Sequence, residues 1–232
     1  MHNMKSFVFA GIAAATLLTA SAASAALIGD FQLNNSLANG VGGGVTLSNN
    51  GATLGVSGLT FGANQGPTIS GLGILSVYTL ETQFSFDSVS GYRKIADFYN
   101  LTSDTGFYVL SQSLNFYATA FINPQNINAG DLITVKLTRD ASNDVSGYLN
   151  NVQQFTFNDS GNLAVIQNNL NLFRDDFPTG QREASSGFVN YITLDGTVDA
   201  GAVPEPSAWA LMILGFGSAG AMIRRRRSLA VA

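Results

Sequence analysis

Hydrophobic side chains between residues 27 and 198 occur in short runs, separated by Gly, Asn, Ser and Thr. Leu80, Phe84 and Phe86 alternate with polar neighbours, which is the period of two of a half-buried β-strand. No long stretch has a helical period. Further strands are predicted at residues 27–33, 59–62, 92–99, 106–110, 114–121, 133–137, 145–149, 153–157, 170–174 and 188–194.

Many short strands parted by turn residues predict an all-β fold, an antiparallel two-sheet sandwich. Residues 140–144 (Asp-Ala-Ser-Asn-Asp) predict a hairpin turn, because Asn and Asp tolerate a left-handed backbone. Residues 42–44 are three glycines and predict a flexible loop, since no Lys-Ser or Lys-Thr follows to make a phosphate-binding loop. No repeat of fixed period is present, which disfavours solenoids and propellers.

The first segment, residues 1–25, has the composition of a signal peptide. It has a basic start ending at Lys5, an apolar stretch at 7–18, and small residues at Ala23 and Ala25 that suit signal cleavage. The alternative is a membrane-spanning helix, but the apolar run is shorter than the roughly 20 residues a span needs. We therefore expect the mature protein to begin directly after this segment.

The last segment, residues 202–232, differs abruptly from what precedes it. A Pro-rich motif at 203–210 leads into a 16-residue apolar stretch at 208–223, which predicts a single, short transmembrane helix. Arginines directly behind it predict that this end stays cytoplasmic and the sandwich lies outside. The residues that define the tail are Pro204, Glu205, Pro206, Trp209, Arg224, Arg225, Arg226 and Arg227.

This three-part order closely resembles the PEP-CTERM sorting signal, in its variant with Trp-Ala three residues after the second proline. The resemblance implies recognition by an exosortase, a transpeptidase-like membrane enzyme, and processing near Pro-Glu-Pro in Gram-negative bacteria that make exopolysaccharide. Secretion machinery would export the protein across the inner membrane. It would be anchored there transiently and delivered to the cell surface or extracellular matrix. An ordinary tail anchor would explain the apolar run and the arginines, but not Pro-Glu-Pro.

The composition of residues 26–201 excludes several functions. Six Lys or Arg stand against fourteen Asp or Glu, a net charge of −8 that argues against nucleic acid as a partner. The chain has no Cys, so no disulfide supports the fold. Its one histidine, His2, falls in the predicted signal peptide. A mature chain without His or Cys cannot form a Ser-His-Asp triad, a Cys-His dyad or an imidazole-ligated metal site.

The order and spacing of the apolar runs resemble the laminin-G-like and concanavalin A-like sandwiches of lectins and glucanases, which implies a jelly roll over residues 26–201. The resemblance is carried by residues 78–86, 91–98, 106–109, 114–117, 132–140, 147–150, 172–176 and 186–194. Glucanases of this fold use closely spaced glutamates, whereas Glu81 and Glu183 lie far apart, without a carboxylate two or four positions away. Both are expected to face solvent, so the resemblance carries over the fold and not the activity.

Two kinds of ligand are compatible with the residues present, and neither has a predicted site. Such sandwiches often hold calcium through loop oxygens, but turns are rich in Asp for conformational reasons alone. The weak calcium candidates are Asp104, Asp140, Asp144, Asp175 and Asp176. Sugar binding needs an aromatic platform beside amides and carboxylates, although most aromatics in a sandwich are structural. The tyrosines available are Tyr92, Tyr99, Tyr108, Tyr117, Tyr148 and Tyr191.

The sequence therefore favours a non-catalytic, exported envelope or matrix protein whose lectin-like sandwich binds exopolysaccharide. A glycan hydrolase or lyase that uses Asp pairs is the alternative from the enzyme class. A purely structural surface protein without a small ligand is a third. Ice binding is disfavoured because no repeated Thr-x-Thr array is present.

Overall fold

The computed structural model describes residues 25–117, 119 and 125–197, and in this part of the chain it contains strands and no helix. The described residues accordingly include no helix long and apolar enough to cross a membrane. The predicted transmembrane helix at 208–223 and all but the last residue of the predicted signal peptide lie outside them. The strands are β1 (Ala26–Phe31), β2 (Thr46–Ser48), β3 (Thr53–Leu54), β4 (Leu59–Phe61), β5 (Thr68–Ser70), β6 (Val77–Phe86), β7 (Tyr92–Asp97), β8 (Gly106–Leu110), β9 (Ser113–Tyr117), β10 (Ile133–Arg139), β11 (Asp144–Leu149), β12 (Val152–Asn158), β13 (Asn169–Leu172) and β14 (Gly187–Thr197).

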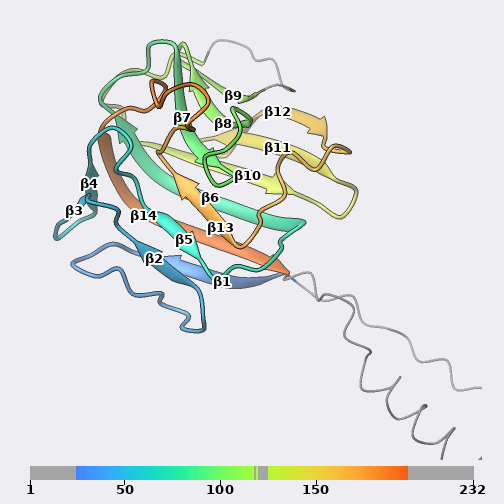
Figure 1. The fold of residues 1–232 in the computed structure, drawn as a ribbon, viewed down its shortest axis with the longest axis horizontal. Coiled ribbons are helices and arrows are strands. Elements are labelled where there is room, and N and C mark those ends of the chain that lie inside the picture. The colour runs from blue at the N-terminus through green and yellow to red at the C-terminus, as the bar shows by residue number, and fades with distance from the viewer. Residues whose placement is uncertain (1–24, 118, 120–124, 198–232) are drawn as a thin grey trace, which may run out of the picture.

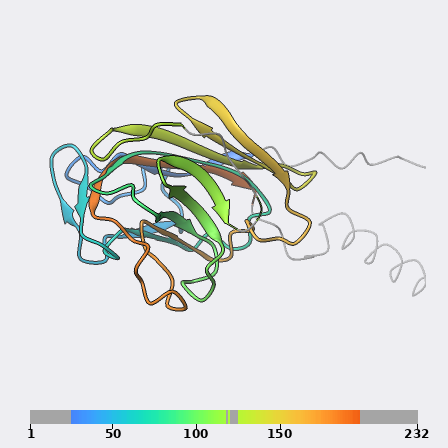
Figure 2. The ribbon, with the colours of Figure 1, turned by 90° about the horizontal axis from the view of Figure 1, so that it is seen from above.

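These strands form two antiparallel sheets packed face to face (Figures 1 and 2). The eight-stranded sheet has the order β12-β11-β10-β6-β14-β4-β3, and its long strand β14 also pairs with β1. The six-stranded sheet has the order β2-β5-β13-β7-β8-β9. The prediction of an all-β, two-sheet antiparallel sandwich is confirmed.

Three short strands, β2, β3 and β5, were not predicted. Their pattern is too short to show a period: β5 contributes only Ile69 to the core, between half-buried Thr68 and Ser70. The predicted hairpin turn is present between β10 and β11. Its first residue, Asp140, accepts backbone N–H bonds from Ser142 at 2.8 Å and from Asp144 at 2.9 Å through Oδ1.

The core lies between the sheets and is rich in phenylalanine. Phe173, directly after β13, is fully buried and stacks on Phe61 with ring centroids 4.6 Å apart. It also contacts Phe84 at 4.9 Å and Phe86 at 5.7 Å, so one ring joins three aromatic side chains from β4 and β6. Its φ of 58° is unusual for a bulky residue and turns the chain out of β13. Packing of the ring offsets that backbone strain.

The loop between β13 and β14, residues 173–186, folds over the outer face of the six-stranded sheet. In Figure 2 it is the orange loop that projects beside the green loop between β7 and β8. Three backbone hydrogen bonds of 2.9 Å attach it: Phe173 N–H to the Ile95 carbonyl, Lys94 N–H to the Glu183 carbonyl, and Phe177 N–H to the Leu101 carbonyl. Lys94 and Asp97 of β7 are therefore buried beneath the loop.

Candidate functional site

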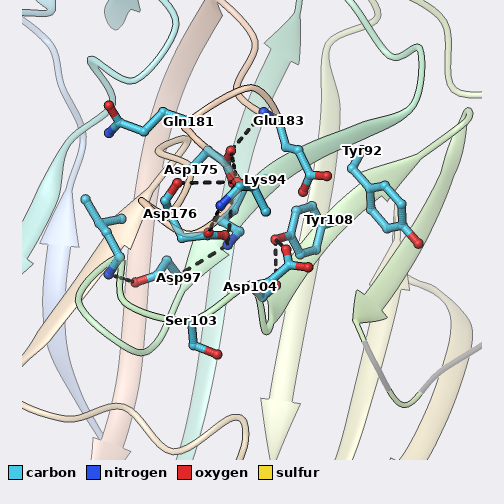
Figure 3. Close-up of polar contacts among 12 residues, drawn as sticks. Tyr92, Lys94, Asp97, Ser103, Asp104, Tyr108, Asp175, Asp176, Gln181 and Glu183 are labelled. Atoms are coloured by element: carbon cyan, nitrogen blue, oxygen red, sulfur yellow. Dashed lines mark hydrogen bonds and ion pairs between the residues drawn. The ribbon is translucent and has the colours of Figure 1, made fainter.

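Lys94, on the outer face of β7, is the centre of a buried charged cluster (Figure 3). Its Nζ lies 2.6 Å from Asp176 Oδ2, 3.6 Å from Asp175 Oδ1 and 3.8 Å from Asp97 Oδ2. All four side chains are fully buried. The ammonium also lies 4.8 Å from the ring centroid of Tyr108, its cross-strand neighbour. One positive charge thus faces three carboxyl groups out of contact with solvent.

Hydrogen bonds from the chain hold the carboxyl groups in place. Asp97 Oδ1 accepts the N–H of Leu101 at 2.7 Å, and Asp175 Oδ2 accepts the N–H of Glu183 at 2.8 Å. Asp176 Oδ1 accepts the N–H of Thr179 at 2.9 Å. Within the described part of the chain, Asp97 Oδ2 and Asp175 Oδ1 are buried and accept no hydrogen bond. Each carboxyl group thus has one oxygen fixed by a backbone N–H, and of the oxygens that face Lys94 only Asp176 Oδ2 accepts its hydrogen bond.

Burial and charge act in opposite directions on the acidities of this cluster. For Asp97, burial outweighs the N–H donors and Lys94, and raises the pKa above its ordinary value. For Asp176, burial is outweighed by the hydrogen bonds from Lys94 and Thr179, which lower the pKa. The carboxyl at 2.6 Å from the ammonium therefore holds the charge, whereas the more distant Asp97 binds a proton more readily.

Three tyrosines lie beside the cluster on neighbouring strands β7, β8 and β9. Tyr92 makes edge contacts with Tyr108 at 5.4 Å and Tyr117 at 5.6 Å between ring centroids. Tyr108 is buried and donates its hydroxyl proton to the Asp104 carbonyl at 2.7 Å, whereas Tyr92 and Tyr117 are partly exposed. The buried ring supports the two exposed ones, which form an aromatic surface.

Glu183 and Asp104 border this aromatic surface, and both side chains are partly exposed. Burial, followed by the negative charges of Asp104 and Asp175, raises the pKa of Glu183 to about 7. Glu183 is therefore not the fully solvated residue that its polar loop predicted. Near neutral pH the carboxyl group of Glu183 therefore exists in both its protonated and its ionised form. The protonated form can donate a hydrogen bond, and the ionised form only accepts.

Glu183→Gln is expected to change how stability depends on pH. Folded Glu183 keeps its proton up to about pH 7, whereas in the unfolded chain it is lost near 4.5. The stability that Glu183 contributes is therefore complete below pH 4.5 and is lost as the pH rises through about 7. Urea unfolding at about pH 5 and about pH 8 should show wild type losing more stability than the variant. Glu81→Gln, on the outer face of β6, is the control, and equal pH slopes for wild type and Glu183→Gln would contradict the expectation.

The structure separates the calcium candidates. Asp175 and Asp176 converge on Lys94, while Asp140 and Asp144 lie in the β10–β11 hairpin turn of the other sheet. Asp104 lies beside Tyr108. Among the described residues no group of three or more His, Cys, Asp or Glu side chains could hold a metal ion. Where the carboxylates do converge, the centre is an ammonium ion.

Sequence reasoning did not single out Lys94 or join it to Asp97 and the two later aspartates. Lys94 lies 82 positions from Asp176 in sequence, and no local pattern relates them. One signal was present: Lys94 directly precedes the apolar pair Ile95 and Ala96 in a predicted strand, in a domain with only six basic residues. A charged residue in such a strand requires a partner.

The fold defines the chain as a two-sheet antiparallel β-sandwich. The binding domain of botulinum neurotoxin serotype D is 9% identical over 74% of this chain, with a TM-score of 0.51. Domain 4 of AbnA, a GH43 extracellular arabinanase from Geobacillus stearothermophilus solved with arabinotriose, is 13% identical over 74% of this chain and 93% of that one, with a TM-score of 0.49. The chain spans 48% of the neurotoxin chain, and at these identities the likeness concerns the fold alone. No curated protein matches the sequence.

The tail identifies the chain more closely. Residues 202–227 match the PEP-CTERM protein-sorting motif, which confirms the resemblance seen in the sequence. The chain therefore carries an exosortase sorting signal and is an exported protein, transiently anchored in the membrane and sorted to the cell surface.

Proposed function

We propose that this exported protein is a non-catalytic lectin that binds exopolysaccharide on the outer face of its six-stranded sheet. The observation that carries the proposal is the surface formed by Tyr92 and Tyr117, supported by buried Tyr108 and bordered by Glu183 and Asp104. Apolar faces of sugar rings pack on aromatic rings, and carboxyl groups accept hydrogen bonds from sugar hydroxyls.

The setting of this surface favours a neutral polysaccharide. Asp104 and Glu183 border the surface, and Asp97, Asp175 and Asp176 lie around the one ammonium of Lys94, so carboxyl groups outnumber positive charges here and disfavour an acidic glycan. A hollow lined by Val89, Ser90, Ser111 and Gln112 lies at the start of β7, where Ser111 N–H bonds the Gly91 carbonyl at 2.9 Å. Its serine and glutamine side chains offer further hydroxyl and amide groups, and Ser90 lies two residues before Tyr92 in the chain.

Tyr92→Ala and Tyr117→Ala are each expected to weaken glycan binding at least about tenfold, which corresponds to about 1.4 kcal/mol. The measurement is a glycan array followed by titration with the best neutral polysaccharide, using the exported protein with and without calcium. Tyr148→Ala removes a partly exposed tyrosine from the other sheet and is the matched control. Failure of wild type to bind any polysaccharide would refute the lectin proposal.

A glycan hydrolase is the second candidate, and Glu183 favours it. A carboxyl group whose pKa is about 7, next to a second carboxyl on Asp104, has the properties of a general acid paired with a base or nucleophile. The same titration distinguishes the two functions, because hydrolysis releases reducing ends. Reducing ends that appear with wild type and not with Glu183→Gln would assign the hydrolase.

For the tail, we propose that exosortase processing near Pro-Glu-Pro releases the protein from its membrane anchor. Pro204→Ala combined with Pro206→Ala is expected to leave the chain at full length in the membrane fraction, because the motif that the enzyme reads is lost. Immunoblots of membrane and culture fractions measure this. Ser207→Ala lies between the second proline and Trp209 and should be processed normally. Normal release of the double variant would exclude this role of the motif.

A further inference from the structure

The contact between Lys94 and Asp176 is a short ion pair out of contact with solvent. Nζ lies 2.6 Å from Oδ2, which is one bond from the carboxyl carbon, and both side chains are fully buried. A buried lysine amine is a good nucleophile once it loses its proton. Held next to a carboxyl group, it gains the rate advantage of an intramolecular reaction.

From this geometry we infer that Lys94 and Asp176 condense to an intramolecular amide, a covalent link between β7 and the loop that covers it. No other part of the described chain offers a buried amine beside a carboxyl group. The second buried ion pair joins Arg139 to Asp159 at 2.8 Å, and a guanidinium is not a nucleophile for this reaction.

The surroundings of Asp176 suit the reaction. Its Oδ1 accepts the N–H of Thr179 at 2.9 Å, and the Thr179 hydroxyl, which also bonds Asp175 Oδ2 at 2.8 Å, lies 3.2 Å from it. These donors would stabilise the negative charge that develops on Oδ1 when Nζ attacks the carboxyl carbon. Oδ2, which faces Lys94, is then the oxygen that leaves.

The protons can be supplied and removed inside the cluster. Moving one proton from the ammonium to Oδ2 across the 2.6 Å contact converts the resting ion pair to a neutral amine and a carboxylic acid. Asp97 Oδ2, 3.8 Å from Nζ, is placed to accept a further amine proton and return it to the leaving oxygen. Burial raises the pKa of Asp97, which suits a group that carries a proton. A C–N bond forms, the C–Oδ2 bond breaks and one water leaves, so no oxidant is needed.

The amide would serve a chain that cannot use disulfides. The sequence has no Cys, yet the protein is exported. A covalent link between positions 82 residues apart restricts the unfolded chain as a disulfide does. It would also keep the 173–186 loop, and with it Glu183, in place beside the tyrosines.

Peptide mass spectrometry of the denatured full chain after trypsin digestion tests the inference. An amidated lysine is not cleaved, so residues 94–136 should appear joined to residues 175–182, lighter than the two separate peptides by one water. Fragmentation should place the bond on Asp176. Recovery of 95–136 and 175–182 only as separate peptides, or a bond on Asp175, would overturn the inference.

Variants separate the chemistry from the fold. Asp176→Ala should abolish the joined peptide, while Asp97→Asn, which keeps both reacting groups, should slow its formation at least tenfold. Circular dichroism shows whether each variant is folded. A folded Asp97→Asn protein that forms the link at the wild-type rate would contradict the role of Asp97. Cleavage after Lys136, whose amine lies over Tyr148 and makes no ion pair within 4 Å among the described residues, is the internal control.

Discussion

Lys94→Met is expected to lower the free energy of unfolding by about 3–5 kcal/mol at neutral pH. The substitution keeps an unbranched side chain, one atom shorter than that of lysine, and removes its charge. Asp97, Asp175 and Asp176 are then left buried without a counter-ion. If wild type contains the Lys94–Asp176 amide, the loss exceeds this range, because Lys94→Met also removes the covalent link that restricts the unfolded chain.

Urea unfolding at neutral and acid pH measures this effect. Lys94 lowers the pKa of Asp176 against the effect of burial, so the stability Asp176 contributes is present at neutral pH and is lost as pH falls. The difference between wild type and variant should therefore shrink in acid. Lys136→Met, at a half-exposed position over Tyr148, should cost about 1 kcal/mol or less. Equal losses at both lysines would show that the cluster does not depend on its ammonium.

Phe173→Ala is expected to cost about 3–5 kcal/mol, the range for removing a fully buried phenylalanine. The ring stacks on Phe61 and touches Phe84 and Phe86, so its loss opens a cavity among three aromatic side chains that strands hold in place. Because Phe173 also begins the loop that holds Asp175 and Asp176, glycan binding should weaken with stability.

Phe177→Ala is the matched control, because it is the same substitution four residues later in the same loop. Phe177 is 62% exposed, so its truncation should change stability by about 0.5 kcal/mol or less. Thermal or urea unfolding of both variants decides the comparison. Similar losses of stability at the two positions would contradict the expectation that burial of the Phe173 ring in the aromatic cluster stabilises the fold.

The strands could be predicted where a period of two was long enough to see. Strand β6 alternates buried and half-buried residues over its ten positions, and the β10–β11 turn follows from the conformational preferences of Asn and Asp. Strands β2, β3 and β5 have two or three residues each with a single apolar residue, whereas the equally short β4 has Leu59 and Phe61 on one face. The first three form because partner strands supply the hydrogen bonds.

The candidate site could not be predicted in the same way. Glu183 was expected in solvent because its neighbours in sequence are polar, but the fold brings Asp104 and Asp175 close enough to raise its pKa to about 7. Tyr92 and Tyr117 were only two of several tyrosines. The order β7-β8-β9 makes them neighbours.

By itself, the sequence determined the sandwich class, the lack of His and Cys chemistry in the predicted mature chain, and the sorting tail at 202–227. Each of these depends on residue type or on local spacing. Only the tertiary structure decided that Lys94 meets Asp97, Asp175 and Asp176, and that tyrosines from three strands form one surface. The physical reason is that strand pairing and the fold of the 173–186 loop bring together residues far apart in sequence, and their burial then sets their charge and reactivity.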